Sequence, residues 1–98
     1  MSFKEISSGE LKARLDAGEK VVLLDVRQPE EHEAENIPNS MLIPLGELEE
    51  RIDELDDYKD TELVVYCRSG ARSANACMFL QMMGFENPVN LRGGMLDW

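Results

Sequence analysis

The hydrophobic positions of this chain fall into short apolar runs separated by segments with helical spacing. Val21–Val26 is apolar at nearly every position, and Leu63–Tyr66 is a second run rich in β-branched and aromatic residues. Strands that are apolar on both faces are typical of a parallel sheet covered on two sides. Shorter runs predict three further strands, at Phe3–Ile6, Met41–Ile43 and Val89–Leu91.

Helical patterns lie between these runs. Ser7 and Glu10 have the spacing of a capping box, which predicts a helix that ends near Gly18. Apolar residues at helical spacing predict a second helix over Gly46–Asp56, with an acidic outer face, and a third over Ser73–Met83. Strands that alternate with helices in this way predict an α/β fold with a parallel sheet.

Length and charge narrow the class of protein. The 98 residues are expected to form a single domain over residues 1–98. A formal net charge of −10 argues against nucleic acid or an anionic membrane surface as the main partner. No apolar stretch is long enough to span a membrane. The first residues resemble no secretory signal and the chain has 2 cysteines, so we expect a reducing compartment and a cytoplasmic location.

The candidate chemistry is concentrated after the Leu63–Tyr66 strand. The connection to the next helix reads Cys67-Arg68-Ser69-Gly70-Ala71-Arg72-Ser73. A tight loop of this kind points successive backbone N–H groups inward, and the helix adds the positive end of its dipole. These groups, together with the arginines, lower the pKa of a thiol. We therefore expect Cys67 to be an activated nucleophile.

Three further residues are candidates for the chemistry or its support: Asp25, Cys77 and His32. Asp25 and Cys67 both lie at carboxyl ends of strands, where ligands bind in open parallel sheets, so we expect them to face one crevice. Cys77 lies in the middle of the last helix among small and apolar residues, which indicates core packing, with a role as a resolving or sulfur-accepting cysteine as the alternative. His32 lies in a polar, acidic segment, which favours a partly exposed structural contact.

Three blocks of the sequence resemble the rhodanese family of sulfurtransferases. Leu24-Asp25-Val26-Arg27 with Glu31 resembles the family's Asp-x-Arg…Glu segment, and the loop that begins at Cys67 resembles its active-site loop. Leu91-Arg92-Gly93-Gly94 with Trp98 resembles its closing Gly-Gly…Trp segment. The resemblance spans nearly the whole chain. It implies a three-layer α/β/α fold with a central five-stranded parallel sheet.

The resemblance also implies a thiosulfate sulfurtransferase. Cys67 would take a sulfane sulfur from a small anionic donor and pass it, through a persulfide, to cyanide, a thiol or a protein. The residues expected to bind the substrate are Arg68, Ser69, Gly70, Ala71, Arg72 and Ser73. Arg27 and Glu31 are expected to form an ion pair that braces the loop. Asp25 is expected to accept hydrogen bonds from the loop, with a part in the chemistry as the alternative. We expect neither a metal nor a cofactor.

The chain departs from the family's pattern in two places. Glu35-Asn36-Ile37-Pro38-Asn39-Ser40 stands where the family often has Gly-His-Ile-Pro-Gly-Ala. Asn39 replaces a glycine at positive φ with little penalty, whereas Glu35 does not, so this segment is expected to run differently. The family also leads us to expect a further helix beyond Trp98, so the chain is either naturally short or trimmed there.

Alternative functions remain open at this point. Phosphatases and arsenate reductases of related fold place five residues between cysteine and arginine, whereas here four residues separate Cys67 from Arg72. Interaction modules of the rhodanese type usually lack the cysteine, which this chain has. A sulfur relay that takes its sulfur from another protein's persulfide is a further alternative. Arg68 argues against mercaptopyruvate as the donor, and the sequence leaves the acceptor and oligomeric state unassigned.

Overall fold

The computed structural model describes residues 3–98 as one parallel sheet with helices packed against it. The five strands have the order β1-β5-β4-β2-β3, and every pair is parallel. The strands are β1 (Lys4–Ile6), β2 (Leu23–Asp25), β3 (Met41–Leu42), β4 (Glu62–Tyr66) and β5 (Asn87–Leu91). The helices are α1 (Ser8–Asp16), α2 (Pro29–Ala34) and α3 (Ala71–Met82), with 3₁₀ helices η1 (Leu45–Glu47), η2 (Ile52–Tyr58) and η3 (Gly94–Asp97). The expected α/β fold is confirmed.

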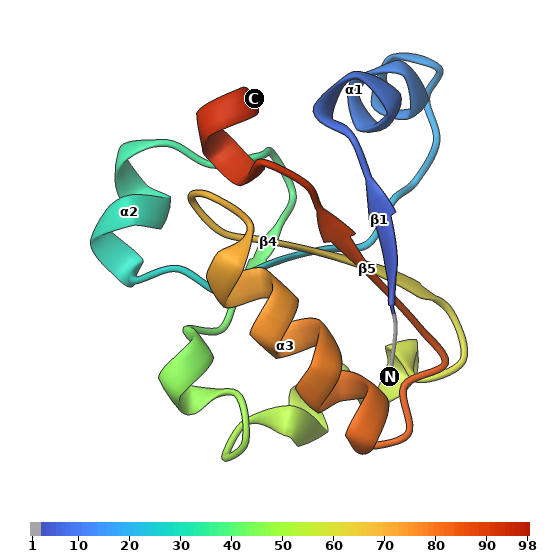
Figure 1. Ribbon diagram of the computed structural model, residues 1–98, viewed down its shortest axis with the longest axis vertical. Coiled ribbons are helices and arrows are strands. Elements are labelled where there is room, and N and C mark those ends of the chain that lie inside the picture. The colour runs from blue at the N-terminus through green and yellow to red at the C-terminus, as the bar shows by residue number, and fades with distance from the viewer. Residues whose placement is uncertain (1–2) are drawn as a thin grey trace.

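Two apolar clusters cover the two faces of the sheet. On one face, Val65 of β4 packs in a cluster with Ala76 and Leu80 of α3 and with Leu48 and Leu55 of the η1–η2 region. Figure 1 shows α3 lying across this face. The other cluster holds the alternate residues of the same strand together with side chains of α1 and η3. Successive residues of a strand point to opposite faces, so strands that are apolar throughout supply both cores.

The capping box at the start of α1 is confirmed. The Ser7 hydroxyl accepts a hydrogen bond from the Glu10 backbone N–H over 3.1 Å, and the Glu10 carboxylate accepts one from the Ser7 N–H over 3.1 Å. These two bonds satisfy backbone donors that have no partner within the helix. The helix ends at Asp16, and Gly18 then turns the chain with a φ of +83°.

The helix predicted over Gly46–Asp56 is wrong. Two 3₁₀ helices, η1 and η2, form there instead. The helical conformation is interrupted between them at Arg51, which has φ −107° and ψ 13°. The apolar spacing explains the difference. Leu45 and Leu48 are three residues apart, as are Ile52 and Leu55, so each pair matches the repeat of three that defines a 3₁₀ helix. An α-helical reading merged two separate turns.

The topology places one end of the sheet at the centre of the candidate chemistry. β4 lies between β5 and β2, so the residue after Tyr66 emerges in the interior of the sheet and not at an edge. In Figure 1, α2, the loop before α3 and η3 gather at this end.

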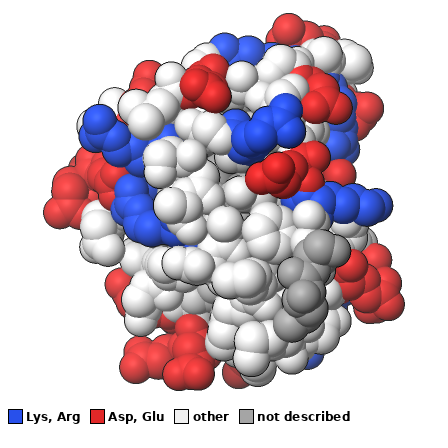
Figure 2. Space-filling model, in the orientation of Figure 1, with Lys and Arg blue, Asp and Glu red and all other residues white. Residues whose placement is uncertain are grey.

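Over residues 3–98, no helix is long and apolar enough to cross a membrane. Figure 2 shows the acidic side chains spread mainly around the rim of the visible face, with little charge over its middle.

Candidate active site

The candidate active site is built on the loop that joins β4 to α3. Cys67 directly follows β4, and α3 begins at Ala71, two residues earlier than the sequence predicted. Gly70, the residue before α3, has a φ of +101°, a conformation that residues other than glycine rarely adopt. A Cβ at this position would also lie 3.3 Å from the backbone nitrogen of Gly93. The tight turn therefore depends on glycine.

Hydrogen-bond donors from this turn converge on the sulfur of Cys67. The backbone N–H of Gly70 donates to Sγ over 3.1 Å, and the backbone N–H of Ser73 donates to it over 3.4 Å. The Ser73 hydroxyl also lies 3.4 Å from this sulfur. Cys67 is 0% exposed, so these groups replace the water that would otherwise solvate a thiolate.

The surroundings of Cys67 favour its ionised form. Burial by itself raises the pKa of the thiol, but hydrogen bonds outweigh it and hold the pKa of Cys67 below its ordinary value. The donors are the Ser73 hydroxyl and the backbone N–H groups of Ser73, Gly70 and Ser69. The sequence also predicted help from the loop arginines. Short-range hydrogen bonds are the main favourable contribution, and Arg72, although its guanidinium is paired with Glu31, also interacts with the charge of Cys67.

Asn90 was not singled out from the sequence, and it supports this loop from β5. Its side-chain oxygen lies 2.5 Å from the Ser73 hydroxyl, whose single proton is shared between this oxygen and the Cys67 sulfur, and its side-chain nitrogen donates to the Gly70 carbonyl over 3.2 Å. Asn90 is 3% exposed. The available signal was a polar residue between Val89 and Leu91 in an otherwise apolar strand, because a buried amide requires hydrogen-bond partners.

The Gly93–Gly94 pair closes the loop from the other side. The backbone N–H groups of Met95 and Leu96, at the start of η3, donate to the carbonyls of Cys67 and Arg68, each over 3.0 Å. Gly94 has a φ of +55°, and a Cβ there would lie 2.4 Å from the Cys67 carbonyl oxygen. This contact explains why the closing segment needs a glycine at this point.

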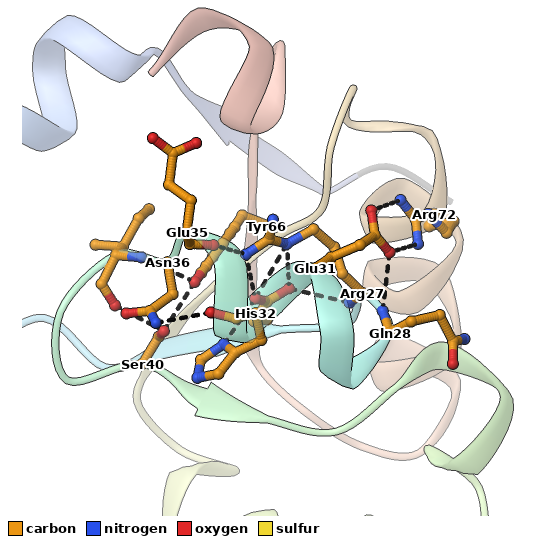
Figure 3. Close-up of polar contacts among 11 residues, drawn as sticks. Arg27, Gln28, Glu31, His32, Glu35, Asn36, Ser40, Tyr66 and Arg72 are labelled. Atoms are coloured by element: carbon orange, nitrogen blue, oxygen red, sulfur yellow. Dashed lines mark hydrogen bonds and ion pairs between the residues drawn. The ribbon is translucent and has the colours of Figure 1, made fainter.

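Asp25 is a structural acceptor, but for its own segment and not for the Cys67 loop. Its carboxylate is fully buried and accepts hydrogen bonds from the Arg27 backbone and guanidinium, the shortest at 2.7 Å, and from His32 Nδ1 over 2.9 Å. Burial opposes ionisation, yet these donors keep the pKa of Asp25 below its ordinary value. Arg27 also donates to the Glu35 carbonyl over 2.6 Å. Figure 3 shows the Arg27 and His32 side chains of this cluster.

The predicted ion pair between Arg27 and Glu31 is wrong. Arg27 pairs with Asp25, and Glu31 instead forms a two-bond ion pair with Arg72, at 2.8 and 3.0 Å (Figure 3). The hydrogen bonds from Arg72 lower the pKa of Glu31 to about 2. Glu31 does brace the loop, because this pair ties α2 to the first turn of α3. The prediction paired Glu31 with a neighbour in the sequence, whereas its partner in the structure, Arg72, lies 41 positions further along the chain.

The segment that departs from the family's pattern is ordered by the end of β4. Asn39 adopts a φ of +68°, as predicted, whereas Glu35 is extended at φ −162° and has no need of a glycine. The Tyr66 hydroxyl accepts a hydrogen bond from the Ile37 N–H over 3.1 Å and lies 2.8 Å from the Ser40 hydroxyl. This segment is therefore fixed against β4 without a histidine.

A cavity of about 230 Å³ lies beside the loop. We call it the mouth cavity, and its lining consists of Arg27, Glu31, Ala34, Glu35, Arg68, Met95 and Leu96. Neither Cys67 nor Asp25 is part of this lining, and both are fully buried, so the two do not face one open crevice as expected. The exposed Arg68 side chain has no ion-pair partner among residues 3–98.

The second cysteine, Cys77, lies in the core, where its thiol has low reactivity. Cys77 is fully buried, and burial raises the pKa of its thiol to about 12. A thiol with such a pKa stays protonated near neutral pH and is a poor nucleophile. Among residues 3–98, no group of three or more histidine, cysteine or acidic side chains is arranged to hold a metal ion.

Comparisons with known proteins agree with this architecture. The family model described as the rhodanese-like domain matches residues 7–98. The chain is 44% identical over 98 residues to YtwF of Bacillus subtilis, with 100% of this chain and 92% of that protein covered. It is 42% identical over 94 residues to a protein of Allochromatium vinosum named Sulfurtransferase, with 96% and 86% covered.

A solved structure gives the same result. The crystal structure of a rhodanese-like domain protein from Staphylococcus aureus matches with a TM-score of 0.86 and 35% identity, covering 98% of this chain and 91% of that one. The fold is that of the rhodanese-like α/β proteins, and proteins named as sulfurtransferases are among the relatives. The chain belongs to the rhodanese-like domain family, as the three sequence blocks indicated.

The first prediction concerns the hydroxyl beside the sulfur. Ser73→Ala raises the pKa of Cys67, because a charged thiolate attracts the hydroxyl proton more strongly than the Asn90 amide oxygen does. The pKa is measured from the pH dependence of Cys67 alkylation. Ser69→Ala is the matched control, since Ser69 contributes its backbone N–H, which alanine retains. An unchanged pKa in Ser73→Ala would mean that the hydroxyl stays on Asn90.

The second prediction concerns the glycine that closes the loop. Gly94→Ala places a Cβ against the Cys67 carbonyl at a positive φ, so we expect a loss of roughly 2 kcal/mol in the free energy of unfolding. Urea denaturation measures it. Gly46→Ala is the control, because nothing lies within 4 Å of a Cβ at Gly46. Equal stability of the two variants would contradict the close approach.

Proposed function

We propose that this protein is a thiosulfate sulfurtransferase that carries the transferred sulfur as a persulfide on Cys67. The observation that supports this most directly is the convergence of the Gly70 and Ser73 backbone N–H groups on Cys67 Sγ, at 3.1 and 3.4 Å. Donors in this arrangement stabilise a thiolate before transfer. A ring of backbone N–H groups also suits the terminal sulfur of a persulfide, which carries the negative charge after transfer.

The reaction has two halves. In the first, the Cys67 thiolate attacks the outer sulfur of thiosulfate, a new S–S bond forms, the S–S bond of thiosulfate breaks, and sulfite leaves with the electron pair. In the second, cyanide or a deprotonated thiol attacks the terminal sulfur, and Cys67 leaves as a thiolate. An acceptor thiol first loses its proton to solvent. The lowered pKa of Cys67 assists both halves, because the thiolate is the attacking group in one and the leaving group in the other.

Arg68 is the group best suited to recognise the anionic end of the donor. It lines the mouth cavity beside the nucleophile, whereas Arg27 and Arg72 are both held in ion pairs. Since Cys67 is 0% exposed, a donor reaches the sulfur after side chains at this mouth move aside. Docking of the donor on Arg68 would bring its outer sulfur toward Cys67.

A sulfur relay with a protein donor is the second candidate. Leu96 is 63% exposed at the mouth cavity, where it lies with Ala34 and Met95. An apolar rim of this kind suits contact with another protein more than with a small dianion. Phosphatase or arsenate reductase chemistry has less support, because four residues and not five separate Cys67 from Arg72, and Arg72 is engaged by Glu31. The presence of Cys67 argues against a pure interaction module.

The third prediction tests the persulfide carrier. Cys67→Ser abolishes thiocyanate formation from thiosulfate and cyanide and prevents the mass increase of one sulfur atom, because the nucleophile is gone. Cys77→Ala retains both, since the Cys77 thiol is buried and protonated. A folded but inactive Cys77→Ala variant would overturn the single-cysteine mechanism. Aryl-phosphate hydrolysis by the native protein that depends on Cys67 and matches the rate of sulfur transfer would favour the phosphatase alternative.

The fourth prediction tests donor recognition. Arg68→Ala raises the thiosulfate KM about tenfold, the effect of one lost charge-assisted hydrogen bond, with a smaller change in kcat. Steady-state kinetics over a range of thiosulfate concentrations measure both constants. Arg92→Ala is the control, because Arg92 is also exposed but pairs with Glu5 of β1 at 3.9 Å. An unchanged KM in Arg68→Ala would remove the assignment.

A further inference from the structure

In the ion pair between Glu31 and Arg72, the carboxylate of Glu31 binds a guanidinium that could otherwise bind an anionic ligand. Both terminal nitrogens of Arg72 donate to Glu31, one to each carboxylate oxygen, at 2.8 and 3.0 Å. The carboxylate is itself held in place, because Glu31 Oε1 accepts the Gln28 backbone N–H over 2.9 Å at the start of α2. Arg72 belongs to the first turn of α3, five positions after Cys67. Figure 3 shows its guanidinium turned onto Glu31.

The remaining charges at the mouth cavity leave little net attraction for a dianion. Its lining holds two arginines, Arg27 and Arg68, and two acidic residues, Glu31 and Glu35. Arg27 is buried and paired with Asp25, so Arg68 is the remaining cation of this lining without an ion-pair partner among residues 3–98. The chain as a whole carries a formal charge of −10. Release of Arg72 would add a second guanidinium within reach of the loop.

We propose that Glu31 is a specificity-determining residue that keeps the affinity of the site for divalent oxyanions low by holding Arg72 away from the ligand. This inference rests on the proposed sulfur transfer, in which sulfite leaves as a dianion. Two free arginines would hold such an anion by several charge-assisted hydrogen bonds and slow its departure. With Arg72 paired to Glu31, the donor meets one free arginine and transfers its sulfur. The sulfite that remains is then released.

The test uses inorganic sulfate as the probe and the rate of Cys67 alkylation as the readout, at constant ionic strength. Sulfate bound at the loop shields the sulfur and slows its modification. Glu31→Gln preserves the size of the side chain and removes the charge that holds Arg72 in the ion pair. We therefore expect half-maximal protection at about tenfold lower sulfate concentration than in the native protein. Glu35→Gln removes one negative charge from the same cavity without releasing Arg72, and we expect a much smaller change.

A double variant assigns the effect to Arg72. Glu31→Gln combined with Arg72→Ala returns the protection to the native level, because the guanidinium that Glu31→Gln releases is then absent. The inference is overturned if Glu31→Gln and Glu35→Gln shift protection equally, or if the double variant keeps the gain. Circular dichroism verifies the fold of each variant, and Glu31→Ala, which also releases Arg72, tests the idea if Glu31→Gln does not fold.

The readout also separates this inference from the proposed function. Alkylation reports anion binding whether or not sulfur is transferred. If the native protein moves no sulfur from thiosulfate but the Arg72-dependent gain in Glu31→Gln is found, the donor assignment fails and the role of Glu31 in anion affinity stands. If sulfur is transferred and the gain is absent, the proposed function stands and the role of Glu31 fails. In active protein, Glu31→Gln should also make sulfite a stronger product inhibitor by a similar factor.

Discussion

The arrangement of this protein depends on closing a backbone loop tightly over a buried sulfur. Donors can converge on Cys67 only if the chain reverses within a few residues of β4, and Gly70 permits that reversal at a φ of +101°. The outer side of the loop must then be satisfied as well. η3 supplies N–H groups to the carbonyls of Cys67 and Arg68, and Gly94 makes room for that approach. A buried, unsatisfied backbone group at either place would destabilise the loop.

Ion pairing divides the arginines of the site into distinct roles. Arg27 is buried against Asp25 and ties the end of β2 to the backbone after α2. Arg72 ties α3 to α2 through Glu31. The hydrogen bonds that lower the pKa of Cys67 come from the Ser73 hydroxyl and from backbone N–H groups. The local environment therefore favours a thiolate in a strongly acidic protein, because short hydrogen bonds act where a distant net charge is screened by solvent.

Much of the fold could be predicted because the signals were local. The apolar runs around β2 and β4, the capping box at Ser7, and the strand–cysteine–glycine–helix connection each occupy a few consecutive residues. Repeated patterns of that kind specify element type, and alternation of strands with helices specifies the class of fold. The failure at Gly46–Asp56 has the same origin. A spacing of three and a spacing of four alternate there, and local periodicity does not separate one α-helix from two 3₁₀ turns.

The sequence by itself determined where the cysteine loop lies and why it closes, since Cys67, Gly70 and the start of the next helix are neighbours in the chain. Tertiary structure decided which groups support that loop. Glu31 meets Arg72 across 41 positions, and Asn90 meets Ser73 across 17. Those contacts exist because β5 lies beside β4 and α2 packs next to the start of α3. A charged or polar side chain takes the partner that folding places within about 3 Å, and the residue types alone do not name that partner.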